Sequence, residues 1–181
     1  MSRAPATPEA PGRDWPEEVH QIFRRMAVRQ VAHVPDAGLA RLIELCAGDA
    51  GMRAITLTRE DEGVGLLLGA WLGGQRGALL MQSSGVGNIV NALSLVRVCR
   101  FPLLVLVTMR GEWGEFNPWQ VPMGQATRRV LEAQGMIVED ATDPAEVGPT
   151  VEAAAKLAFD GQQGVAVTIA QRVIGTKEFK D

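Results

Sequence analysis

The chain has 181 residues, of which 46% are hydrophobic and 22% are charged. This composition is typical of one globular domain and excludes a chain that is disordered throughout. The net charge of −3 lacks the basic excess of a general nucleic-acid binder. The longest uncharged apolar stretch, Gly63 to Gly74, is far shorter than the roughly 20 residues that span a bilayer. We therefore expect neither nucleic acid nor a membrane as a partner.

Prolines recur in residues 1–13, which hold no apolar core of a signal peptide. We expect this segment to be disordered and residues 14–181 to form a single domain. The two cysteines, Cys46 and Cys99, fall in segments that we expect to be helical and buried. Such cysteines are typical of the reducing cytoplasm, and the lack of metal-ligand spacing predicts no metal site in this chain.

Apolar segments of strand length alternate with amphipathic segments of helix length, and no internal repeat is found. This order predicts a three-layer α/β domain with a mostly parallel six-stranded sheet and helices on both faces. Runs such as LLVLV, which are apolar on both sides, agree with strands that helices cover on both faces. The expected strands are Gln30–Val34, Ala54–Thr58, Gly77–Gln82, Leu103–Thr108, Met136–Glu139 and Gly164–Ala170.

Two helices have clear start signals. Asp36 is a candidate N-cap for a helix over Ala37–Ala47. Asp143, followed by a proline at the first helical position, predicts a helix over Pro144–Phe159.

An irregular connection is expected after the fourth strand, over Arg110–Gly124. It holds two tryptophans, two prolines and three glycines. A connection of about 15 residues is long for a compact domain and is often functional. The alternative is a surface excursion in which Trp113 and Trp119 pack against their own domain.

Glycines recur every four residues at Gly65, Gly69 and Gly73, so they form one ridge on a helix. Each costs roughly 0.8–1 kcal/mol of helix propensity relative to alanine, which indicates that something approaches the ridge closely. It is either an interface with a partner chain or a cofactor, or a crowded contact with the chain's own sheet. A dinucleotide-type reading of the glycines that begin at Gly63 is rejected, because they lie inside the helix rather than in the preceding turn.

Ligands of open parallel sheets bind outside the carboxyl ends of the strands. After the third strand, the residues Ser84–Asn88 predict a glycine-rich turn before a helix that begins near Asn88. Its N–H groups could receive a polar or anionic ligand, or the turn could be an ordinary tight connection. Three carboxylates, Glu60, Asp61 and Glu62, follow the second strand. They either cap a helix, or one of them transfers protons; the residues alone do not say which.

Four motifs occur together in this order: V-P-D at residues 34–36, R-E-x-E-G-V-G-L at 59–66, M-Q-S-S-G-V-G-N at 81–88 and R-G-E at 110–112. With them, the chain from about Trp15 to Arg172 resembles the pyrimidine-binding domain of thiamine-diphosphate-dependent 2-oxo acid decarboxylases. Within that family the likeness is closest to sulfopyruvate decarboxylase α subunits, and it extends to phosphonopyruvate decarboxylases. The resemblance implies the corresponding fold and a decarboxylase (lyase) activity.

The resemblance also implies roles for single residues. Glu60, rather than Glu62, corresponds to the family's glutamate that hydrogen-bonds the aminopyrimidine and activates the cofactor. Asp36 falls close to an acidic proton shuttle of some relatives, although it could equally be only a helix cap. Arg110, supported by Gln120, would bind the anionic end of a substrate. The residues expected beside the cofactor are Gln82, Ser83, Ser84, Gly85 and Asn88.

The chain departs from the family pattern in two ways. No histidine occurs in the connection after the fourth strand; aromatic residues occur there instead, which would suit a bulkier or more apolar 2-oxo acid. The GDG motif that holds the diphosphate and Mg²⁺ is also missing, since Gly48-Asp49 is followed by Ala50. The resemblance therefore implies a β subunit that carries thiamine diphosphate's diphosphate and Mg²⁺, and a hetero-oligomer with the active site between chains. A carboligase subunit and a non-catalytic scaffold or regulator are the alternatives.

Overall fold

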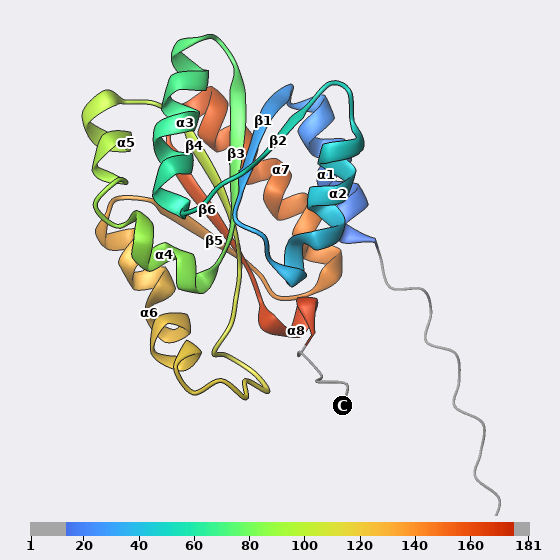
Figure 1. Cartoon of the computed structure of the whole chain (residues 1–181), viewed down its shortest axis with the longest axis vertical. Helices are drawn as coiled ribbons and strands as arrows, with labels where there is room; N and C mark the ends of the chain where they lie inside the picture. Colours follow the sequence, from blue (N-terminus) through green and yellow to red (C-terminus); the bar gives the residue numbers. More distant parts are fainter. Residues whose placement is uncertain (1–13, 176–181) are drawn as a thin grey trace, which may run out of the picture.

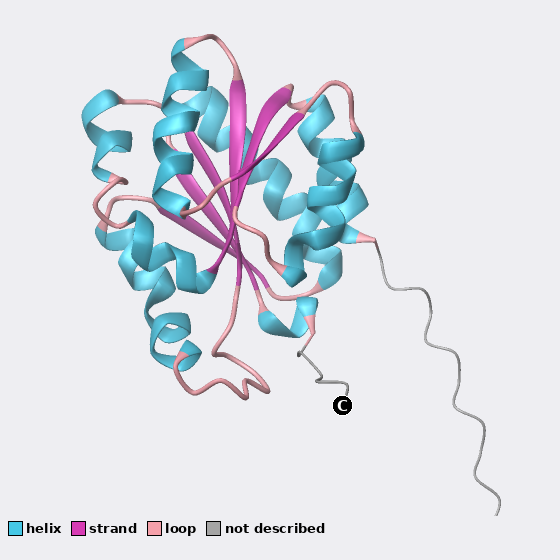
Figure 2. Ribbon diagram, in the orientation of Figure 1, coloured by secondary structure: helices cyan, strands magenta, loops and turns pink. Residues whose placement is uncertain are grey.

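Six parallel strands form the centre of the computed structural model, which describes residues 14–175 (Figures 1 and 2). The strand order is β2-β1-β3-β4-β6-β5, and every neighbouring pair is parallel. Helices cover both faces of the sheet, so the predicted three-layer α/β fold is confirmed. The predicted disordered segment, residues 1–13, lies outside the described residues, as do residues 176–181 at the other end of the predicted domain.

All six predicted strands are present, and their ends differ from the prediction by at most two residues. Every residue of β4 and β6 is buried, because these central strands contact helices on both sides. The strands are β1 Val28–His33, β2 Arg53–Thr56, β3 Arg76–Gln82, β4 Leu103–Thr108, β5 Ile137–Ala141 and β6 Gly164–Ile169.

The helices divide into two layers that fill two separate hydrophobic cores. One core joins α1, α2 and α7 to the sheet, and the other joins α3, α4, α5 and α6 to its opposite face (Figure 1). The helices are α1 Trp15–Arg25, the 3₁₀ turn Ala37–Leu39, α2 Ala40–Gly48, α3 Glu60–Leu72, α4 Ser83–Ile89, α5 Ser94–Cys99, α6 Gln120–Ala133, α7 Pro144–Gly161 and α8 Gln171–Ile174.

Of the two predicted helix N-caps, Asp143 is confirmed and Asp36 is not. Asp143 caps α7, since its side chain accepts a hydrogen bond of 2.8 Å from the Ala145 N–H. The cap expected at Asp36 is wrong: a 3₁₀ turn precedes α2, and the Asp36 side chain makes no capping hydrogen bond. Its carboxylate points instead to side chains of neighbouring strands, as described below.

Three further predictions are corrected. The expected glycine-rich turn after β3 is a helix, α4, which begins at Ser83 because tertiary packing overrides the low helix propensity of its glycines. The irregular connection after β4 is shorter than expected, because α6 begins at Gln120 and tolerates Pro122 in its first turn. Cys46 is buried as predicted, whereas Cys99, the last residue of α5, is exposed.

The topology opens a crevice between β1 and β3. These strands are neighbours, yet the chain leaves β1 toward α2 on one face and leaves β3 toward α4 on the other. Such a point, where connections diverge, is where open α/β sheets bind ligands at the carboxyl ends of their strands. In the described part of the chain, no helix combines the length and the apolar character needed to cross a membrane.

Candidate functional site

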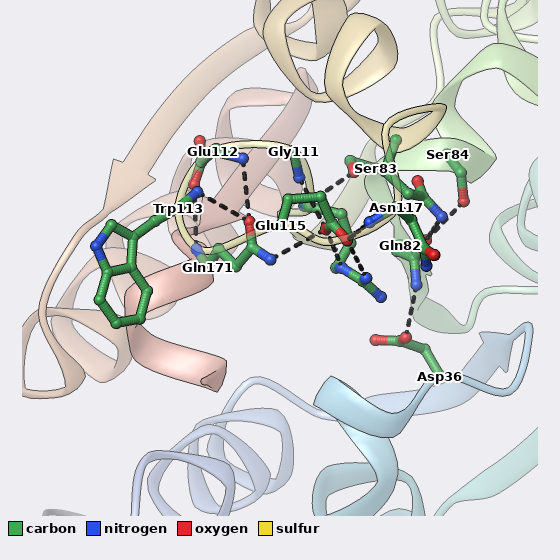
Figure 3. A network of polar contacts seen from close by, with 12 residues as sticks. Asp36, Gln82, Ser83, Ser84, Gly111, Glu112, Trp113, Glu115, Asn117 and Gln171 are labelled. Carbon is green, nitrogen blue, oxygen red and sulfur yellow. Dashed lines mark hydrogen bonds and ion pairs between the residues drawn. The ribbon is translucent and has the colours of Figure 1, made fainter. Parts of the chain in front are cut away.

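The crevice between β1 and β3 contains a carboxylate that two neighbouring strands hold in place. Gln82 Nε2, at the end of β3, donates to Asp36 Oδ1 at 3.0 Å. Thr108 Oγ1, at the end of β4, donates to Asp36 Oδ2 at 2.7 Å. Gln120 Nε2 in turn donates to Gln82 Oε1 at 3.1 Å, and Ser84 Oγ donates to the same oxygen at 2.9 Å. Asp36 is therefore oriented across the sheet edge rather than along its own helix (Figure 3).

The three carboxylates at the start of α3 have three different environments. Glu62 accepts the backbone N–H of Thr58 at 3.1 Å, and hydrogen bonds from Thr58 hold the pKa of Glu62 below its usual value. This is the capping contact expected of an acidic residue in the first turn. Asp61 forms an ion pair with Arg59 at 3.2 Å. Glu60 does neither and is 7% exposed.

Glu60 packs against the start of α4. Its Oε2 accepts a hydrogen bond of 2.7 Å from Asn88 Nδ2, and Asn88 is the one residue of the described chain that donates to this carboxylate. A Cβ atom at Gly85 would collide with the Glu60 carboxylate, so glycine is required there for α4 to approach α3. The second oxygen, Oε1, thus remains available to a donor from outside the described chain.

A second buried carboxylate, Glu115, lies in the connection between β4 and α6, residues 110–119, which we call the aromatic loop. Its side chain is 3% exposed and accepts hydrogen bonds of 2.6 Å from both Nε and Nη2 of Arg110. The N–H groups of Gly111 and Asn117 also donate to it. These hydrogen bonds, with that from Arg110 the strongest, lower the pKa of Glu115 to about 2.

The aromatic loop is also tied to α4 and to the end of β6. The backbone N–H of Arg110 donates to Ser83 Oγ at 3.1 Å, so this buried serine anchors the loop. Gln171, the first residue of α8, accepts the N–H groups of Glu112 and Trp113 at 3.0 and 3.1 Å and donates to Glu115 at 3.0 Å (Figure 3). Sequence reasoning missed Gln171, although its position directly after a strand was a usable signal.

The aromatic side chains of this loop are exposed to different degrees, and two of them contact arginines of the same domain. Arg110 Cζ lies 5.9 Å from the Phe116 ring centre, and Arg172 Cζ lies 5.6 Å from that of Trp113. Trp113 is 48% exposed, Phe116 42% and Trp119 71%. The alternative in which both tryptophans pack against their own domain is wrong for Trp119, whereas Trp113 keeps a contact with Arg172. The loop projects beyond the carboxyl edge of the sheet, at the bottom of Figure 1. It presents an apolar, aromatic surface to whatever binds at this edge.

The glycine ridge of α3 faces away from the sheet. A Cβ atom at Gly65 or Gly69 would meet no atom within 4 Å, and both residues are exposed. The crowded glycine is Gly63, whose Cβ would press on Leu57 and Leu79. The alternative in which the ridge packs against the chain's own sheet is therefore wrong, and the ridge forms an open surface.

The structure thus groups the predicted residues into two sets, which α4 connects. Glu60, Gly85 and Asn88 form one set. The other set joins residues at or just after the ends of three strands, β1, β3 and β4, with the first residue of α6, namely Asp36, Gln82, Ser83, Ser84, Arg110 and Gln120. Within residues 14–175, no group of three or more His, Cys, Asp or Glu side chains is placed to hold a metal ion.

A separate cavity of about 390 Å³ lies at the carboxyl ends of β5 and β6. Two of its charged lining residues, Arg128 and Asp140, pair with each other, and Arg128 also contacts Glu132 outside the cavity at 2.8 Å. The third, Glu112, accepts the backbone N–H of Gln171. Thr168 donates to Asp140 as well. Because these groups already satisfy each other, the cavity offers less unused bonding capacity than the crevice beside Glu60.

Comparisons with known proteins identify relatives of the whole domain. No family model matches the chain. It is 36% identical over 154 residues to sulfopyruvate decarboxylase subunit alpha of Methanococcus maripaludis, covering 84% of this chain and 92% of the relative. The same subunit of Methanothermobacter thermautotrophicus is 32% identical over 157 residues, covering 86% and 95%. Phosphonopyruvate decarboxylase of Streptomyces viridochromogenes is 38% identical over 123 residues, covering 65% of this chain and 31% of that longer protein.

Among solved structures, 2-oxoglutarate:ferredoxin oxidoreductase of Magnetococcus marinus shares the fold, with a TM-score of 0.65 and 14% identity. The match covers 86% of this chain and 28% of that one. The sequence relatives define the class of the protein as a decarboxylase component. More narrowly, the chain belongs to the family of sulfopyruvate decarboxylase α subunits.

Proposed function

We propose that this chain is the α subunit of a heteromeric, thiamine-diphosphate-dependent sulfopyruvate decarboxylase. One observation carries the proposal: in a chain of this family, Glu60 is a buried carboxylate with one hydrogen-bond donor and one oxygen left over. A largely buried carboxylate that keeps one oxygen without a donor from its own chain is placed to accept a hydrogen bond from a ligand. Glu62 and Asp61 are engaged in a cap and an ion pair, which supports Glu60 as the residue for this role.

The residues around Glu60 fit the aminopyrimidine of thiamine diphosphate. Oε1 would accept a hydrogen bond from the ring nitrogen and hold a proton at that atom, while Asn88 fixes the orientation of the carboxylate through Oε2. When bound, the cofactor supplies an electron sink for the carbanion that departing CO₂ leaves behind. Gly85 keeps α4 close enough to enclose the pair, and Gln82 and Ser84 line the same edge.

The substrate would lie between α4 and the aromatic loop. Arg110 uses Nε and Nη2 for Glu115, which leaves the N–H groups of Nη1 to meet an anionic group of the substrate, with Gln120 beside it. Asp36, oriented by Gln82 and Thr108, would hold or return a proton at the crevice. The exposed aromatic side chains of the loop would exclude water from the reacting carbon.

A β subunit would complete the active site. The name of the relatives, subunit alpha, supports such a partner. This chain lacks a GDG sequence, so the diphosphate and Mg²⁺ would belong to that partner. The open glycine ridge of α3, which begins at Glu60, would receive the partner's backbone at close range. The free thiols Cys46 and Cys99 agree with a cytoplasmic enzyme.

The test is CO₂ release from sulfopyruvate by this chain alone and by this chain mixed with a GDG-containing partner, thiamine diphosphate and Mg²⁺. We expect activity only in the mixture. A panel of bulkier 2-oxo acids would measure how far the aromatic loop shifts the substrate preference. A stable complex that releases no CO₂ from any acid would contradict the proposal. Product formation with an added aldehyde would then favour a carboligase. No activity in either assay would favour a scaffold.

A further inference from the structure

Gln171 holds the aromatic loop through several hydrogen bonds, although no sequence motif points to this residue. The side chain is 1% exposed and lies at the carboxyl end of β6. Its Oε1 accepts two consecutive backbone N–H groups of the loop, those of Glu112 and Trp113, while its Nε2 donates to Glu115. Its own backbone N–H donates to Glu112 Oε2 at 3.1 Å. A primary amide is suited to this position, because it combines donor and acceptor in one plane.

Glu115, which Gln171 holds in place, in turn fixes the position of Arg110. The two side chains are 3% and 8% exposed, so water competes little with their paired hydrogen bonds. The Glu115 carboxylate receives five hydrogen bonds, two from Arg110 and one each from Gly111, Asn117 and Gln171. A carboxylate so fully bonded does not leave Arg110 for a substrate. It fixes the guanidinium plane and thereby the direction of Nη1.

We propose that Gln171 is a positioning residue that acts through Glu115 to aim Arg110 at the anionic group of the substrate. The proposal rests on the function proposed above and adds a residue and a direction to its substrate site. The order of action is Gln171 to Glu115 to Arg110. Figure 3 shows the first of these contacts, between Gln171 and Glu115. Gln171 itself touches neither substrate nor cofactor in this arrangement.

The test uses the full chain with Gln171→Met, which keeps the length of the side chain and removes its hydrogen bonds. Hydrogen exchange of residues 111–117 would be measured on the chain alone, and KM and kcat for sulfopyruvate on the assembled enzyme. Gln163→Ala is the matched control, since Gln163 is exposed and lies at the other end of β6. We expect about tenfold faster exchange in the loop, and about tenfold higher KM with kcat changed less than about threefold. The control should match the wild type in all three.

A second variant, Glu115→Gln, keeps the proposal testable if Gln171→Met fails to fold. It removes the negative charge under Arg110 and should raise KM in the same direction, again with little change in kcat. Unchanged loop exchange and unchanged KM in a folded variant would overturn the proposal. A fall in kcat at constant KM would also overturn it, because a positioning role for the substrate anion predicts the opposite split.

The two proposals can fail separately. Loop exchange in the isolated chain reports on the Gln171 contacts whether or not the enzyme decarboxylates sulfopyruvate. An inactive wild-type complex would therefore contradict the proposed function, while faster exchange in Gln171→Met would still support the Gln171–Glu115 link.

Discussion

Two buried glutamates, Glu60 and Glu115, occupy neighbouring parts of the same sheet edge and differ in how far the chain satisfies them. Glu115 receives five hydrogen bonds, two of them from a guanidinium. Glu60 receives one, from the exposed amide of Asn88. Both side chains lie away from solvent, so burial alone does not distinguish them.

Under the proposed function, this difference separates a carboxylate that fixes its neighbours from one that reacts. A fully bonded carboxylate loses much of its capacity to exchange protons and serves to fix its neighbours, as Glu115 fixes Arg110. A carboxylate with an oxygen that no donor of its own chain occupies can accept a hydrogen bond from a ligand. In the proposed function, unused bonding capacity rather than burial distinguishes Glu60 from Glu115.

The largest effect is expected for Glu60→Gln. The amide keeps the size of the side chain but cannot hold a proton as a carboxylate does, so kcat for CO₂ release should fall about 10²–10⁴-fold. Glu62→Gln, in the same turn of α3, is the control and should change kcat less than about twofold. Co-purification with the partner would show that both variants still assemble. A Glu60→Gln enzyme with normal kcat would remove the residue from the mechanism.

Glu115→Ala should act on stability, since it leaves Arg110 buried without its carboxylate. We expect a loss of about 1.5–3 kcal/mol in the free energy of unfolding, or a drop in Tm of roughly 2–4 °C for each kcal/mol in a domain of this size. Thermal unfolding of the isolated chain measures it. Glu60→Ala should destabilise less, because only one neutral donor, the Asn88 amide, loses its acceptor. Equal losses for the two variants would contradict the distinction drawn between them.

The pH dependence follows from the lowered pKa of Glu115. A carboxyl group whose pKa lies at about 2 in the folded chain, against an ordinary value near 4.5, contributes stability that is fully present above about pH 4.5. That contribution declines as the pH falls from about 4.5 toward 2. Urea unfolding at pH 7, 4 and 3 should show the decline in the wild type and a smaller one in Glu115→Gln. An equal decline in the free energy of unfolding for the wild type and Glu115→Gln would show that Glu115 is not the group responsible.

The glycines of α3 differ in a similar way: Gly63 packs against its own chain, whereas Gly69 faces open space. Gly63→Leu should cost about 1–3 kcal/mol, because its side chain would press on Leu57 and Leu79. Gly69→Leu meets no atom of its own chain, so it should leave Tm nearly unchanged and weaken association with the partner instead. Analytical ultracentrifugation of the mixture measures that association. Unimpaired assembly of Gly69→Leu would show that the ridge lies outside the interface.

The smallest effect concerns the thiols. Burial raises the pKa of Cys46 to about 12, so this group should stay unreacted in the folded chain. Cys99 is exposed and should react alone. Titration with a thiol reagent should therefore give one equivalent before unfolding and two after it. Two fast equivalents in the native chain would indicate that α2 opens readily.

The sequence was sufficient where local patterns decide the outcome. The strands were predictable because their apolar runs are buried on both faces. The choice of Glu60 over Glu62 came from the family motif, and its catalytic role stays a prediction. The helix at Ser83–Ile89 was not, since Gly85 and Gly87 disfavour a helix locally and packing against Glu60 supplies the compensation. Gln171 was missed because its partners are 56 to 59 residues away, so only its place after a strand, and no local motif, indicated a role.

Exchange of the C2 proton of thiamine diphosphate tests the central claim most directly, that Glu60 is the carboxylate which activates the cofactor. The rate would be measured in D₂O on the complex of this chain with its partner, with saturating cofactor and no substrate. We predict at least about 100-fold slower exchange in the Glu60→Gln complex than in the wild-type and Glu62→Gln complexes, with the cofactor still bound. Equal exchange rates in all three complexes would contradict the account.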